Sequence, residues 1–186
     1  MTHLYIVRCN FTAPGQEQAW NDWYSGPKIT QMLAQPHFLS CQRFHRTAGT
    51  GRDYLALWTI ASPEALETSQ YTSQWGFADW TRHITGWSRD LFDGGAAAPL
   101  DFAVARDGAL EVVSFDGMGA DDMKATNAAI VQAGQGMTWL PVAGLDRHTP
   151  VIGFRVLAAQ TSVDPGGESV QHAVYRPICE FQSAPG

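Results

Sequence analysis

Residues 21–33, Asn-Asp-Trp-Tyr-Ser-Gly-Pro-Lys-Ile-Thr-Gln-Met-Leu, and the stretch 35–40 that follows, Gln-Pro-His-Phe-Leu-Ser, decide the fold. Apolar residues recur at helical spacing before and within this stretch, at Ala19, Trp20, Trp23 and Tyr24. If the helix is only kinked at Gly26-Pro27, the same face continues to Lys28 and Met32. The sequence therefore predicts an amphipathic helix with one basic side chain on its apolar face, then a proline turn and a strand.

Four runs rich in β-branched and aromatic residues predict strands in the first half of the chain, over residues 4–9, 38–46, 54–60 and 84–92. A second helix is expected to begin at Ser62-Pro63-Glu64, which combines a capping residue, a proline at the first helical position and an acid in the first turn. This helix or its continuation carries Tyr71, Trp75, Trp80 and His83. The first half thus has the predicted order βαββαβ.

The second half repeats this order in part. It has predicted strands at 109–115, 139–145, 151–157 and 172–181 and a predicted helix at 121–133. A loop is expected at 158–168, which contains Asp-Pro-Gly-Gly, where a second helix would complete the repeat. We predict an α+β fold of tandem ferredoxin-like units, residues 1–93 and a degenerate copy at 109–186, joined by a linker at 94–108.

The first half resembles the EthD-like proteins of the dimeric α+β barrel superfamily. The resemblance rests on residues 22–33, on Pro36-His37-Phe38-Leu39-Ser40 and on the strand 54–58, Tyr-Leu-Ala-Leu-Trp, and it covers residues 3–93. For the second half it rests on element order alone. The resemblance implies two ferredoxin-like units that pair through their sheets, so a tandem chain can build the barrel within one molecule, and a homodimer of such chains is the alternative.

Two positions depart from the family pattern. Family members typically carry histidine four positions after the tyrosine, where this chain has Lys28, and the glycine at the start of the following strand is replaced by His37. Both changes fall where these folds usually form a pocket between sheet and helices. The family chemistry of the helix histidine is therefore not carried over to this chain.

Composition excludes several classes of function. The chain has 186 residues, 45% of them hydrophobic, a net charge of −6 and a pI near 5.4, which favours a globular protein and disfavours a nucleic-acid partner. Three dispersed cysteines, Cys9, Cys41 and Cys179, indicate buried thiols in a reducing compartment. With no signal sequence, membrane span, nucleotide-binding motif or metal-ligand spacing, the sequence predicts a cytoplasmic protein without a metal site.

Lys28 is the first candidate for a chemical role. Desolvation on the buried helix face would lower its pKa, which suits a base or an electrostatic clamp for a carboxylate or phenolate. The alternative is a lysine whose stem packs on aromatic rings while its ammonium reaches water.

His45 and Arg43 alternate with Leu39 and Cys41 on one face of the second strand. If this face lines the pocket, Arg43 would bind an anionic group and His45 would transfer protons. The alternative is a hydrogen-bonded pair at a sheet interface, and the sequence does not decide which strand face the pocket uses.

His83 lies behind Tyr71, Trp75 and Phe77 in an aromatic-rich segment. These neighbours could hold a planar substrate while the histidine acts as acid or base, or they could simply fill the core. The residues expected to bind substrate are aromatic, and they are Tyr24, Trp58, Tyr71, Trp75 and Trp80.

Three functions follow from these residues. The first is a cofactor-independent enzyme acting on a small aromatic or polyketide-like acid or phenol, as a decarboxylase, lyase, isomerase or oxygenase, with Lys28, Arg43, His45 and His83 as catalytic candidates. The second is a non-catalytic barrel that binds a small hydrophobic molecule or forms a stress-response oligomer. The third, implied by the resemblance, is a haem enzyme with His45 or His83 as the iron ligand.

Overall fold

The computed structural model of the chain describes residues 2–94, 103–116, 136–158 and 170–185. Eight strands of this part close into an antiparallel barrel in the order β3-β1-β4-β6-β7-β5-β8-β2, because β2 also pairs with β3. They are β1 His3–Phe11, β2 Phe38–Gly49, β3 Tyr54–Ile60, β4 Ile84–Asp93, β5 Ala109–Ser114, β6 Thr138–Leu145, β7 Val151–Leu157 and β8 Gln171–Pro177. A short ninth strand, β9 Gln182–Ser183, pairs with the start of β2. The barrel therefore closes within one molecule.

The strand order repeats between the two halves of the chain. The first half has the order β4-β1-β3-β2 and the second half β8-β5-β7-β6, which is fourth, first, third and second in both. The two joints, β4 with β6 and β8 with β2, each pair the fourth strand of one half with the second strand of the other. The predicted α+β fold with a second ferredoxin-like copy is confirmed. The helix predicted at 121–133, nearly all of the loop at 158–168 and residues 95–102 of the linker lie outside the described residues.

The long helix runs through Pro27 without ending. A 3-10 turn, Pro14–Gln16, leads into α1, Glu17–Trp23, then a π-helical turn, Tyr24–Lys28, and α2, Ile29–Leu33. Because proline has no N–H to donate and its ring crowds the preceding turn, a locally wider turn lets the helix continue past it. Tyr24, Lys28 and Met32 consequently stay on one buried face, as the sequence predicts.

The second helical region begins where predicted but is broken into three short pieces. They are a 3-10 turn Pro63–Leu66, the helix α3, Ser69–Gln74, and a 3-10 turn Ala78–His83. Thr68 caps α3 by accepting a hydrogen bond from the backbone N–H of Tyr71 at 3.1 Å. Gly76, at φ 91°, turns the chain between the last two pieces in a conformation that favours glycine.

The last predicted strand and the turn at His37 need separate comment. The predicted final strand 172–181 is too long: β8 ends at Pro177, which cannot donate a hydrogen bond to a neighbouring strand, and pairing resumes at β9.

His37 has φ 70°, a left-handed conformation that favours glycine. His37 thus takes a backbone conformation that a glycine would adopt without strain.

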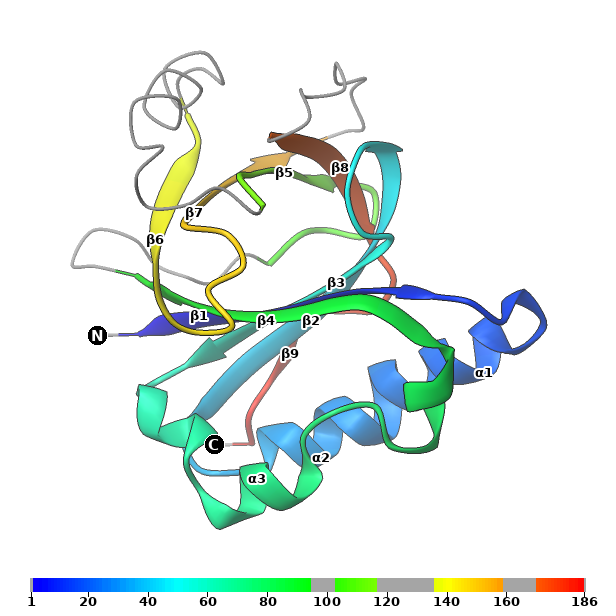
Figure 1. Cartoon of the computed structure of the whole chain (residues 1–186), viewed down its shortest axis with the longest axis vertical. Helices are drawn as coiled ribbons and strands as arrows, with labels where there is room; N and C mark the ends of the chain where they lie inside the picture. Colours follow the sequence, from blue (N-terminus) through cyan, green and yellow to red (C-terminus); the bar gives the residue numbers. More distant parts are fainter. Residues whose placement is uncertain (1, 95–102, 117–135, 159–169, 186) are drawn as a thin grey trace.

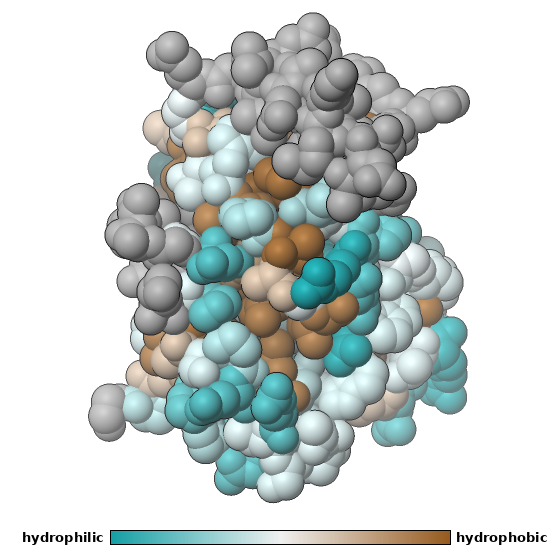
Figure 2. Space-filling model, turned by 60° about the vertical axis from the view of Figure 1, so that its left-hand side comes forward, coloured by the Kyte–Doolittle hydropathy of each residue, from teal (hydrophilic) through white to brown (hydrophobic). Residues whose placement is uncertain are grey.

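Two apolar cores lie on the two sides of the first-half sheet. The barrel interior is filled by residues such as Leu4, Ile6 and Phe44. The outer face of β1–β4 is covered by the helices and packs residues such as Tyr5, Trp20 and Trp58 against them (Figure 1). One face of the molecule shows a hydrophobic band bordered by hydrophilic side chains (Figure 2). No helix in the described part of the chain is long and apolar enough to span a membrane.

Candidate functional site

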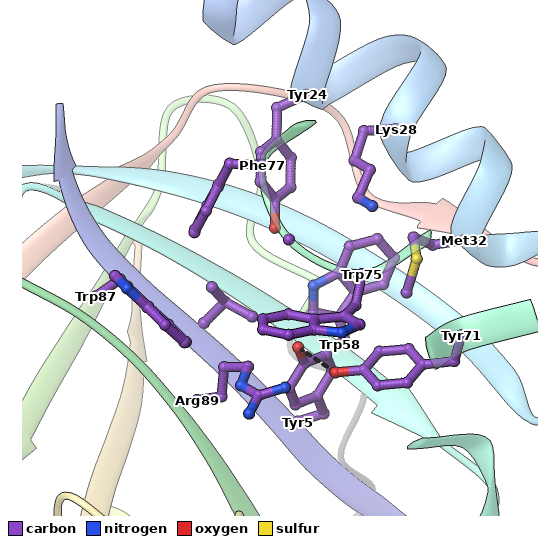
Figure 3. Close-up of a pocket in the computed structure, with 12 residues that line it drawn as sticks. Tyr5, Tyr24, Lys28, Met32, Trp58, Tyr71, Trp75, Phe77, Trp87 and Arg89 are labelled. Atoms are coloured by element: carbon purple, nitrogen blue, oxygen red, sulfur yellow. Dashed lines mark hydrogen bonds between the residues drawn. The ribbon is translucent and has the colours of Figure 1, made fainter. Parts of the chain in front are cut away.

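A cavity lies between the outer face of the first-half sheet and the helices that cover it. Figure 3 shows Tyr24, Lys28 and Met32 reaching in from the long helix, opposite the strand residues Tyr5 and Arg89. The remaining lining residues are mostly aromatic, and they are Val7, Trp58, Tyr71, Trp75, Gly76, Phe77 and Trp87. The cavity volume open to water is about 20 Å³, room for only one or two water molecules.

Lys28 provides the amine of this cavity. Its side chain is only 5% exposed, and its Nζ donates a hydrogen bond to the backbone carbonyl of Gln74 at the end of α3. Burial lowers the pKa of the Lys28 amine from 10.5 to about 8, because the charged form loses its hydration. Near neutral pH this lysine can therefore exchange protons, which an exposed lysine does not do readily.

The opposite wall consists of two tyrosines and an arginine. The hydroxyls of Tyr5 and Tyr71 lie 3.0 Å apart and share a hydrogen bond. Burial raises the pKa of Tyr5 well above its usual range, so the Tyr5 hydroxyl stays protonated. Burial by itself would lower the pKa of Arg89, but the Tyr71 and Tyr5 hydroxyls together with Asp146 raise it above its ordinary value.

The charges of the cavity are positive although the chain is acidic overall. Lys28 and Arg89 both line it, and no carboxylate of the described residues does. Arg89 has a carboxylate neighbour, Asp146, with 3.4 Å between Nη2 and Oδ1, and that side chain is partly exposed to solvent. Lys28 is buried, and Arg89 is partly buried with its acid outside the cavity lining, so the two cations favour an anionic guest such as a carboxylate or phenolate attached to an aromatic ring.

Five of the residues predicted from the sequence meet at this cavity: Lys28, Tyr24, Trp58, Tyr71 and Trp75. Trp80 does not line it and packs instead on Phe11, with ring centroids 6.1 Å apart. His45 stands against Tyr54 at 4.8 Å, and His83 lies at the end of a 3-10 turn, 5.8 Å from Phe11. The catalytic roles predicted for His45 and His83 stay predictions.

Arg43 lies behind the cavity. It is fully buried, and its guanidinium donates to Ser25 Oγ at 2.9 Å and to Asn21 Oδ1 at 2.9 Å, both on the helix side. It also stacks on Tyr24, with Cζ 4.1 Å from the ring centroid. Burial lowers the pKa of Arg43. These contacts fix the helix segment that carries Lys28 against β2.

Sequence reasoning missed Arg89, Tyr5 and Trp87 as lining residues. Tyr5 and Val7 share one face of the first strand by their spacing of two, and Trp87 and Arg89 share one face of β4. What the sequence could not supply is the pairing, in which Val7 stands opposite Arg89. Gln74 accepts the Lys28 hydrogen bond through its backbone carbonyl, so its residue type could not reveal this contact in the sequence.

The class of protein that fold and cavity define is the ferredoxin-like α+β barrel, and solved structures share it. The chain aligns over its full length with 94% of an anthrone oxidase-like protein at a TM-score of 0.63 and 12% identity. It also aligns over its full length with 95% of a provisionally named monooxygenase from Fusobacterium nucleatum, at 0.53 and 10%. A mutant chlorite dismutase from Candidatus Nitrospira defluvii matches 95% of the chain over 92% of its own length, at 0.51 and 12%.

These likenesses show that the chain has the ferredoxin-like α+β barrel fold. No family model and no curated protein matches the sequence. The nearer relationship to EthD-like proteins stays a prediction.

Haem does not fit the cavity as built. An axial histidine is the ligand that the sequence offered for haem iron, at His45 or His83. Among the described residues, no histidine lines the cavity, so it offers no such ligand to haem iron.

Proposed function

We propose that the protein is a cofactor-independent oxygenase acting on a small aromatic phenol or acid. The observation that carries the proposal is Lys28, a buried amine with a lowered pKa that faces aromatic walls and a second cation, Arg89. The names of two neighbours of like fold, an anthrone oxidase-like protein and a provisionally named monooxygenase, favour oxygenation over decarboxylation, lyase chemistry and isomerisation.

In the proposed mechanism, neutral Lys28 takes the hydroxyl proton of the phenol, and the ammonium that forms stays beside the phenolate. Arg89 provides a second positive charge that favours the anion. Trp58, Trp75 and Phe77 exclude water from the ring. The electron-rich phenolate then reacts with dioxygen: one phenol with a free ring C–H and one O₂ give one quinone and one water.

A substrate panel with three proteins tests the proposal. Wild type, Lys28→Met and Arg82→Met are assayed against phenols and aromatic acids, with oxygen consumption and quinone absorbance as readouts. Loss of general-base catalysis is expected to lower kcat/KM of Lys28→Met at least about 100-fold. Arg82 is an exposed cation on a neighbouring 3-10 turn, so Arg82→Met should keep wild-type activity.

Equal turnover by wild type and Lys28→Met would overturn the role of Lys28. Tight binding of aromatic acids without turnover by the wild type would instead favour the non-catalytic ligand-binding barrel. A homodimer, a cytoplasmic location and an aromatic small-molecule partner belong to the same proposal.

A further inference from the structure

The cavity is too small for the substrate that its chemistry favours, whereas a larger hollow lies directly outside it. The outer hollow has a volume of about 340 Å³, within the range of small-molecule sites, against about 20 Å³ for the inner cavity. Four residues line both spaces and so form the partition between them: Trp75, Gly76, Phe77 and Trp87. An aromatic ring can reach Lys28 only if part of this partition moves.

Trp75 is the movable part of the partition. Phe77 is 6% exposed and packs on Tyr24. Trp75 and Trp87 are about equally exposed, at 41% and 42%, but the backbone of Trp87 belongs to the strand β4, whereas Trp75 lies on the short segment between α3 and the next 3-10 turn. Its ring is held by the Arg89 guanidinium, 4.2 Å from its centroid, and by the tilted Trp87 ring at 6.0 Å. Such contacts are weak at exposed positions, and exposed side chains change rotamer within nanoseconds.

The backbone next to Trp75 also positions the Lys28 amine. Lys28 donates to the carbonyl of Gln74, the residue directly before Trp75. The following Gly76 has φ 91° and empty space around its Cβ position, so glycine serves the backbone turn there rather than close packing. Movement of the Gln74–Gly76 segment would therefore open the cavity and change the hydrogen bonding of Lys28 together.

We propose that Trp75 is a side-chain gate that admits a planar aromatic anion from the outer hollow to Lys28 and then stacks on it. Arg89, released from the Trp75 ring, pairs with the anionic group of the guest. The gate selects flat guests, because a guest must pass between Trp75 and Trp87. This inference rests on the proposed function for the identity of the guest, but the gate itself can be tested without turnover.

The test uses 2,4,6-trinitrobenzenesulfonate, an aromatic anion whose ring an unprotonated amine attacks, so that a C–N bond forms, the C–S bond breaks and the sulfonate group leaves as sulfite. Lys28 and Lys124 are the only lysines in the sequence, so peptide mass spectrometry reads the labelling rate of each separately. We expect Trp75→Ala to label Lys28 at least tenfold faster than the wild type at pH 8, with Lys124 unchanged as the internal reference. Trp75→Phe, which keeps a smaller ring, should lie between them.

Trp87→Ala is the matched control. Trp87 is about as exposed as Trp75 and also lines both the cavity and the outer hollow, but it lies on the strand β4. It should change the Lys28 labelling rate less than threefold. Equal rates in wild type and Trp75→Ala would overturn the gate, and so would an equal gain in Trp87→Ala. Since the readout is labelling and not activity, a gate confirmed in a protein without turnover would refute the proposed function alone.

Discussion

The two halves of the barrel place different chemistry on equivalent positions of their outer faces. In the first half Tyr5 stands opposite Trp58 and Val7 opposite Arg89, and in the second half Glu111 stands opposite Arg155 and Val113 opposite His172. The interior-facing residues that flank Tyr5 and Glu111 are apolar in both halves, Leu4 and Ile6 in the first and Leu110 and Val112 in the second. The repeat therefore fixes the backbone, and the side chains on the outer face decide what each half does.

The outer face of the second half pairs its charges within the sheet. Glu111 accepts from Arg155 Nε at 2.6 Å and lies 2.6 Å from His172 Nε2. The first face buries the Lys28 amine among aromatic rings, with no acid lining its cavity in the described part of the chain. The charges of the second face are therefore paired within the sheet, whereas Lys28 on the first face has no acid in the lining of its cavity, in keeping with the proposed role in binding an anion.

The largest expected effect concerns the paired face. Glu111→Gln leaves the cation of Arg155 without its carboxylate and should lower the free energy of unfolding by about 2–3 kcal/mol, less than for a fully buried pair because Arg155 is partly exposed. Urea denaturation measures this change. A double-mutant cycle with Arg155→Gln should give a coupling of at least about 1 kcal/mol, and a coupling near zero would show that the two faces do not differ in this way.

The face that carries Lys28 should respond in the opposite direction. The pKa of Lys28 is lower in the folded chain, about 8, than its ordinary 10.5, so below pH 8 a buried charge destabilises the fold, and this cost fades as the pH rises from 8 to 10.5. Lys28→Met should therefore stabilise the protein at pH 7 by about 1–2 kcal/mol, allowing for solvent near the amine. Thermal unfolding from pH 7 to 10.5 should show this gain shrinking. A gain that does not depend on pH would assign it to methionine packing instead.

Activity should follow the same titration. If Lys28 acts as a base, kcat/KM rises with pH and levels off above about pH 9, since the amine loses its proton near pH 8. At pH 7 about one molecule in ten carries the neutral amine, so the rate should be about tenfold below the plateau. A pH–rate profile on any substrate found in the panel measures this. A rate that falls through pH 8 would make Lys28 an electrostatic clamp that acts in its charged form.

The smallest effect concerns the tyrosine pair. Tyr5→Phe removes one partner of the Tyr5–Tyr71 hydrogen bond and should cost about 0.5–1.5 kcal/mol of stability. Because Tyr5, together with Tyr71, also raises the pKa of Arg89, substrate KM should rise more than kcat falls. The control is Tyr175→Phe on the second half, whose hydroxyl donates to the backbone carbonyl of Arg52, away from the cavity. A change in KM in both variants would refute the assignment to the cavity.

The sequence predicted the parts of this site that depend on local periodicity. The helical spacing of Tyr24, Lys28 and Met32 and the capped start at Ser62 need only neighbouring residues, and the structure has both. Arg89 could not be predicted, because its place beside the cavity depends on the register of β4 against β1. The second helical region breaks at Gly76, which has a positive φ. Hydrophobic periodicity carries no information on such a backbone turn.

The orientation of Arg43 is also beyond what the sequence predicts. The sequence leaves open which face of the strand lines a pocket. Packing against the long helix decides that Arg43 points away from the barrel interior and toward Asn21 and Ser25. Gln42, next to it, faces the interior and donates to the carbonyl of Val104. A strand alternates between two faces with certainty, but which face meets the helix is a tertiary property.

The central claim is that the fold holds Lys28 as an amine poised to exchange protons in an aromatic cavity. The most direct measurement is a pH titration by NMR of protein labelled with ¹³C at the lysine ε-carbon, which shows only two lysine signals because the sequence has only Lys28 and Lys124. Lys28→Met assigns them by removing one. The Lys28 signal should titrate with a pKa of about 8. A Lys28 signal that titrates near the ordinary 10.5 would contradict it.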